Sequence, residues 1–136
     1  MDIRVSQLQG KVPVAVLQPH GAMDASNYQD VVAAAREVHQ AGTQHILVDL
    51  SQVPYMSSSG LVALHSIALM LRGEQPPGPE SSWGAMHAFD RERERGMQHH
   101  TKLLSPQPRV QKVLDMAGFT RFLEVYTDLD TALGSF

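Results

Sequence analysis

The stretch that decides the fold is ILVDLSQVPYMSSSGLVAL, residues 46–64 of a chain of 136 residues. Its opening run, ILVDL, is apolar almost throughout and is bounded by turn residues, which is typical of an interior β-strand. Residues 58–73 are apolar around most of a helical circumference, which predicts a well-buried helix. The three serines at 57–59 stand at the junction, where a hydroxyl can cap the helix or be the target of a modification.

Strand and helix patterns alternate on both sides of this stretch, which predicts an α/β fold. The segment from Gly73 to about His100 is rich in Pro, Gly and Ser and then in mixed charges, so we interpret it as a flexible loop inserted into a single domain spanning residues 1–136. The other predicted elements are two strands in 3–19 joined by a turn at Gly10, a helix in 23–42 capped by Asp24 or Ser26, a strand in 101–105, a helix in 108–118, a strand in 122–126 and a short helix in 127–136.

Composition excludes several classes of protein. With 11 Lys and Arg against 14 Asp and Glu, the formal net charge is -3, which does not favour a nucleic-acid partner. There is no Cys, so neither disulfides nor thiolate chemistry are expected. The N-terminal residues do not form a signal peptide, and no apolar run reaches the roughly 20 residues that span a bilayer. We therefore expect a cytoplasmic protein without membrane insertion.

The residues that usually carry catalysis or hold a cofactor do not form any known pattern here. The seven histidines lack metal-binding spacing, so no metal site is expected. A Gly-rich phosphate loop is absent, and the serines lack the Gly-x-Ser-x-Gly elbow of hydrolases. The sequence thus predicts no cofactor and no enzyme, with hydrolysis at the serines as an alternative that activity assays would test.

A serine at the start of a helix places its hydroxyl beside unpaired backbone N–H groups and the positive end of the helix dipole. A phosphate is tolerated there, yet it adds about -1.5 to -2 charges that repel an acidic or closely packed partner. Gly60 has two interpretations. Its missing side chain could let the backbone of another protein approach, or it could be a glycine that is merely tolerated near a helix end.

Three segments resemble the STAS domain family of bacterial anti-sigma factor antagonists. They are LQPHGAMDASNYQDV, ILVDLSQVPYMSSSGLVAL and PQPRVQKVLDMAGFTRFLEVYTDLDTAL, and they occur in the order of that family. The resemblance covers roughly residues 1–72 and 101–136. It implies a mixed sheet of four or five strands with helices packed mainly on one side.

The resemblance also implies a function. In that family the unphosphorylated protein binds an ATP-dependent anti-sigma factor kinase and frees the sigma factor, and phosphorylation of a serine ends the binding. By alignment the phosphorylated residue is Ser58, and Asp24 matches an acidic residue near the partner-binding face. Ser57, Ser59, Gly60 and Leu61 would line the same contact surface.

Two features depart from the family pattern. Ser57 stands where many members have Asp, which removes a negative charge and adds a second candidate hydroxyl. The insertion from Gly73 to about His100 is the other departure. Because some family members do not regulate sigma factors, a constitutive subunit or scaffold of a membrane transport or stress-signalling complex is the alternative function. The sequence leaves open whether the protein forms a homodimer.

Overall fold

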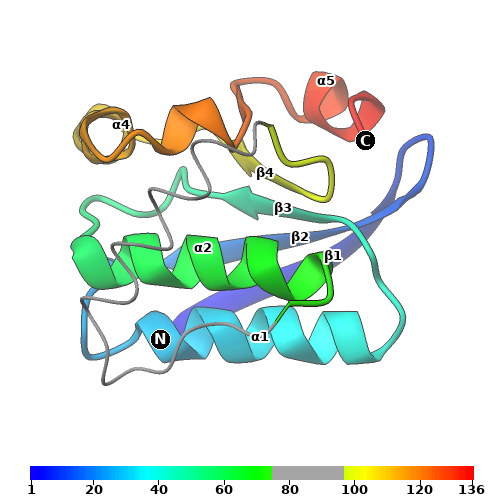
Figure 1. Ribbon diagram of the computed structural model, residues 1–136, viewed down its shortest axis with the longest axis horizontal. Helices are drawn as coiled ribbons and strands as arrows, with labels where there is room; N and C mark the ends of the chain where they lie inside the picture. The colour runs from blue at the N-terminus through cyan, green and yellow to red at the C-terminus, as the bar shows by residue number, and fades with distance from the viewer. Residues whose placement is uncertain (75–96) are drawn as a thin grey trace.

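The computed structural model describes residues 1–74 and 97–136, which form a five-stranded sheet covered by helices (Figure 1). The strands are β1 (Asp2–Gln9), β2 (Pro13–His20), β3 (Ile46–Asp49), β4 (Thr101–Leu104) and β5 (Val125–Tyr126). The helices are α1 (Tyr28–Gln40), α2 (Ser58–Leu71), α4 (Pro108–Met116) and α5 (Leu129–Gly134), with a short 3-10 helix, η1 (Phe119–Arg121). Most of the expected insertion, including Trp83, lies outside the described residues.

The sheet is mixed, with the strands side by side in the order of the sequence. β1 pairs antiparallel with β2, whereas β2, β3, β4 and β5 are parallel to one another. Parallel neighbours need long crossover connections, and the helical segments supply them. β2 begins at Pro13, where the missing N–H of proline is tolerated. The expected mixed sheet is confirmed, with five strands rather than four.

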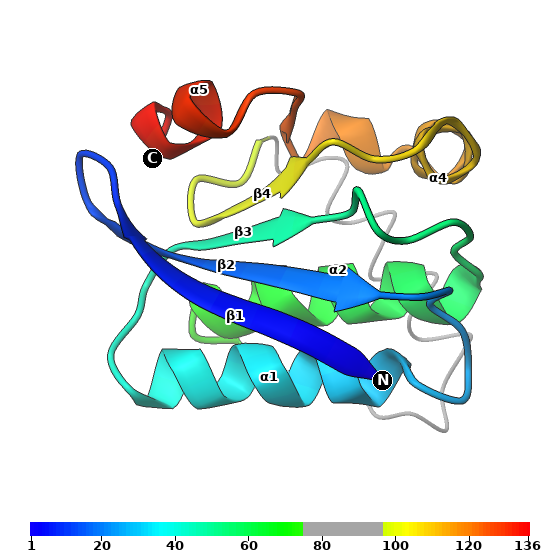
Figure 2. The same ribbon diagram turned by 180° about the vertical axis from the view of Figure 1, so that it is seen from behind.

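The helices divide unequally between the two faces of the sheet. Apolar residues of α1, α2 and α4 share one large core with the inward side chains of β2, β3 and β4. On the opposite face α5 covers a smaller cluster that includes Val14, Leu47 and Leu104. Seen from behind, β1 and β2 lie in front of α2, while α5 lies above β4 at the end of the sheet away from α1 (Figure 2). Helices packed mainly on one side are therefore confirmed.

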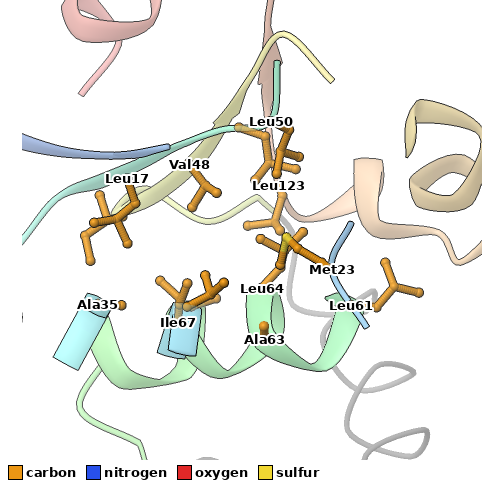
Figure 3. Close-up of a cluster of buried hydrophobic side chains, with 14 of the residues drawn as sticks. Leu17, Met23, Ala35, Val48, Leu50, Leu61, Ala63, Leu64, Ile67 and Leu123 are labelled. Atoms are coloured by element: carbon orange, nitrogen blue, oxygen red, sulfur yellow. The ribbon is translucent and has the colours of Figure 1, made fainter. Parts of the chain in front are cut away.

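α2 is the most enclosed helix. Ten of its fourteen residues are buried, which agrees with the apolar pattern around its circumference. Leu64 and Ile67 are fully buried, and they point toward Val48 and Leu50 at the sheet (Figure 3). Burying side chains of this size stabilises the fold by about 1.5–3 kcal/mol each. The helix is thereby fixed against β3, and its first residue is fixed in place with it.

Two elements are shorter than the sequence predicts. α1 begins at Tyr28 with Asn27 as its N-cap residue, because the residues after Asp24 form a turn before the helix. β5 consists of Val125 and Tyr126 only. The preceding Phe122 is fully buried and follows a 3-10 helix instead of joining the strand.

Candidate functional site

The candidate site lies at the edge of the sheet where the parallel strands β2, β3 and β4 end. The loops that follow these strands lead into the first residues of α1, α2 and α4, which all lie at the left of Figure 1. In open α/β sheets this carboxyl edge is the usual place for a binding site. We call it the carboxyl edge below.

Backbone contacts bring Asp24 next to the serines. Met23 and Met56 form an isolated parallel bridge. The N–H of Met23 donates to the carbonyl of Tyr55 at 3.0 Å, and the N–H of Ser57 donates to the carbonyl of Met23 at 2.9 Å. Asp24 and Ser57, the residues that follow the two methionines, are therefore neighbours although they are far apart in the sequence.

The three serines have different positions in the helix start. Ser57 is the N-cap residue, and its Oγ accepts a hydrogen bond from the N–H of Ser59 at 3.2 Å. Ser58 is the first residue of α2 and is exposed, and its hydroxyl makes no hydrogen bond within the described part of the chain. Ser59 is half-buried. Ser57 thus has a structural task, whereas the hydroxyl of Ser58 is accessible and unengaged.

The electrostatic environment of the serines is set by the start of α2 and by the carboxylate of Asp24. The first turn of α2 has no acidic residue, so no side-chain charge of that turn neutralises the positive end of the helix dipole. The carboxylate of Asp24 accepts hydrogen bonds from the hydroxyl of Ser26 at 2.5 Å and from its N–H at 2.9 Å. These two bonds lower the pKa of Asp24, so it is charged at neutral pH.

Gly60 and Leu61 lie beneath this surface and not on it. Gly60 is buried, and a Cβ there would clash with Cγ of Met56 and would come within 3.2 Å of Cβ of Met23. The glycine therefore lets α2 approach the Met23–Met56 bridge, which gives it a packing role that neither of its two interpretations included. Leu61 is only 7% exposed and belongs to the main core.

Sequence reasoning did not single out Tyr55 and Arg109, which also lie at the carboxyl edge. The guanidinium carbon of Arg109 is 5.5 Å from the ring centroid of Tyr55. The side-chain amide of Gln107 donates to the carbonyl of Ser51 at 2.8 Å and so joins the loop before α4 to the loop after β3. The sequence does show that Tyr55 is an aromatic residue close to the serines, which could have marked it as a candidate. Its contact with Arg109 could not be predicted, because α4 is far away in the sequence.

Neither a base paired with the serine hydroxyls nor a cluster of metal ligands is found within the described residues. None of the hydroxyls of Ser57, Ser58 and Ser59 is hydrogen-bonded to a histidine or another base. In residues 1–74 and 97–136 no three potential metal ligands come together. Across the same residues, none of the helices has the length and apolarity needed to cross a membrane.

Several solved structures have the same fold. A candidate anti-sigma factor antagonist from Thermotoga maritima is 17% identical, with a TM-score of 0.70 over 96% of this chain and 91% of the other. An anti-sigma factor antagonist from Mycobacterium paratuberculosis is 19% identical, with a TM-score of 0.65 over 97% and 90%. The Bacillus cell fate determinant SpoIIAA in its phosphorylated form is 17% identical, with a TM-score of 0.51 over 96% of both chains.

At the level of sequence, no curated protein matches the chain significantly. The STAS domain does match it, over residues 6–75, just over half of its length. The matched segment includes β2, α1, β3 and α2, and with them Asp24 and the three serines. The chain therefore belongs to the STAS domain family.

Proposed function

We propose that this protein is an anti-sigma factor antagonist with Ser58 as its phosphorylated residue. The unphosphorylated form binds an anti-sigma factor kinase and so releases the sigma factor, and phosphorylation of Ser58 ends that binding. The observation that carries the proposal is the exposed, unengaged hydroxyl of Ser58 at the first position of α2. The fold shared with anti-sigma factor antagonists supports it, including SpoIIAA, whose structure is known in both phosphorylated and unphosphorylated forms.

The position of Ser58 suits a reversible switch. Phosphate there lies at the N-terminal end of α2, where the helix dipole favours a negative charge, so the fold tolerates it. It adds about -1.5 to -2 charges next to the charged carboxylate of Asp24. A partner that presses closely on this surface, or that carries acidic groups there, is repelled. Asp24, Ser57 and Ser59 surround Ser58 in the proposed contact surface, and Gly60 and Leu61 support it from below.

The protein is the substrate in this reaction and not the enzyme. The kinase supplies ATP and the base that takes the proton of the Ser58 hydroxyl, and the γ-phosphoryl group moves to Oγ with release of ADP. Ser57 is a poorer acceptor because its Oγ already accepts a hydrogen bond as the helix cap. Replacement of the usual Asp by Ser57 therefore leaves the phosphorylated position unchanged.

The test uses the purified chain, ATP and an anti-sigma factor kinase from the same genome. Intact and fragment masses should show one phosphate, on Ser58. Ser58→Ala should take up none and still bind the kinase, Ser58→Asp should bind more weakly, and the control Ser57→Ala should still be phosphorylated.

Phosphate on Ser57 or Ser59 instead would contradict the assignment of the site. A wild-type chain that takes up no phosphate and co-purifies with a transporter ATPase would instead favour a constitutive STAS subunit.

A further inference from the structure

The carboxyl edge carries a pair of side chains that the serine switch does not use. Tyr55 lies between β3 and α2 and is 43% exposed. Arg109, the second residue of α4, is exposed and places its guanidinium over the Tyr55 ring at 5.5 Å. A cation over an aromatic face is attracted by the ring, which favours this arrangement of the two side chains. The two residues thus form one surface feature, which we call the Tyr55–Arg109 platform.

The loops that carry the platform are fixed with respect to each other. Besides the bond from Gln107 to Ser51, the N–H of Leu50 donates to the carbonyl of Leu104 at 2.9 Å. The N–H of Ser105 donates to the carbonyl of Tyr126 at 2.7 Å and ties the loop after β4 to β5. Ser105 has a φ of 50°, a left-handed conformation that is uncommon for residues other than glycine. Such conformations persist where the surroundings impose them, which is frequent at binding sites. The loops beneath the platform are therefore held in place before any partner binds, which lowers the entropic cost of binding.

The chemistry of the platform indicates what it would bind. Arg109 forms no ion pair with any acidic residue in the described part of the chain. Its N–H donors can therefore take a carboxylate through two parallel hydrogen bonds. Tyrosine and arginine are among the residues that most often dominate the energy of protein interfaces. An acidic group next to an apolar side chain fits this pair.

The platform lies within reach of the same partner as Ser58. Tyr55 and Ser58 are three residues apart, so their Cα atoms are separated by at most about 11 Å. A protein interface of ordinary size covers about 800 Å² on each partner, roughly 30 Å across. One partner centred on Ser58 can therefore cover both Asp24 and the platform. It would then meet an acidic residue as well as a basic, aromatic pair.

We propose that the Tyr55–Arg109 platform is the second half of the docking surface, and that the kinase partner presents to it a carboxylate flanked by an apolar side chain. This inference rests on the proposed function, since it assigns further contacts to the partner of Ser58. The switch and the platform have separate tasks. Ser58 decides whether the partner stays bound, whereas the platform decides which partner binds and in which orientation.

The test is calorimetric titration of the anti-sigma factor kinase that phosphorylates Ser58 into wild-type protein and three variants. Arg109→Gln and Tyr55→Ala should each weaken binding about tenfold or more. Arg36→Gln should bind like the wild type, because Arg36 is an equally exposed arginine within α1, away from the carboxyl edge. Arg109→Gln should also reduce the salt dependence of binding, since it removes one charge from the interface. Thermal unfolding of each variant checks that the fold is intact.

Two results separate this inference from the function on which it rests. If Ser58→Asp weakens binding while Arg109→Gln and Tyr55→Ala bind within about twofold of the wild type, the platform is not a contact and the proposed function stands. If the wild-type chain does not bind the kinase at all, the proposed function and the platform both fail.

Discussion

Because Ser57 caps the helix and Ser58 does not, the same substitution to alanine should destabilise the protein at Ser57 and have little effect at Ser58. Ser57→Ala removes the Oγ that accepts from the N–H of Ser59 at 3.2 Å and leaves that donor without its cap. Loss of a serine N-cap costs about 1 kcal/mol. Ser58→Ala removes a hydroxyl that makes no hydrogen bond in the described part of the chain, so its effect should stay within about 0.5 kcal/mol.

Urea unfolding followed by circular dichroism measures this difference. With a slope of about 1.5–2 kcal/mol/M, Ser57→Ala should lower the unfolding midpoint by about 0.5–0.7 M, and its Tm by roughly 3–4 °C. Ser58→Ala should leave both close to the wild-type values. The neighbouring serine thus serves as a matched control, because the two variants lose the same atom one residue apart.

Ser57→Asp extends the test to the residue that is usual in the family. Aspartate caps a helix as well as serine does, and its charge is favourable by about 0.3–1 kcal/mol at a helix N-terminus. This variant should therefore be at least as stable as the wild type. The reasoning is refuted if Ser58→Ala destabilises the protein as much as Ser57→Ala, or if Ser57→Ala costs less than about 0.3 kcal/mol.

Two further predictions concern the core and a histidine pair. Gly60→Ala should destabilise the protein by about 1–3 kcal/mol in urea unfolding, because its Cβ would overlap Met56. The control Gly134→Ala should be neutral or stabilising, because a Cβ there meets nothing within 4 Å. Equal effects of the two substitutions would disprove the packing role of Gly60. Burial, with the nearby His100 and Lys102, lowers the pKa of His45 in the folded protein, so the unfolded chain binds more protons below its ordinary pKa of about 6.5. Stability should therefore rise as the pH rises toward about 6.5, and His45→Gln should flatten that rise in urea unfolding at several pH values. An unchanged slope would contradict the assignment.

Most of the fold could be predicted because the decisive signals are local. The apolar run from Ile46 and the apolar helix from Ser58 are patterns within single elements, and Gly118 ends its helix with a φ of 76°, as a glycine at that position should. The start of α1 was less predictable. Asp24 is a good cap by type, but its carboxylate is engaged by Ser26 in a turn that precedes the helix.

The candidate site was predictable only in part, because part of it depends on tertiary contacts. The serines and Asp24 belong to local motifs, so they could be found in the sequence. Gly60 is buried against Met23 and Met56 because two distant segments form a bridge. No local sequence pattern indicates that another part of the chain packs against this glycine. The pairing of Tyr55 with Arg109 likewise appears only when the loops after β3 and β4 meet.

The enclosure of α2 has a consequence for how a signal at Ser58 can spread. A helix that is buried over most of its residues cannot rotate or slide without opening voids in a close-packed interior. A phosphate at its first residue therefore changes the surface and leaves the interior as it was. Amide hydrogen exchange in β3 and in the later turns of α2 should be the same before and after phosphorylation. Phosphorylation would then act only through the surface of the protein, and its effect would depend entirely on a partner that contacts this surface.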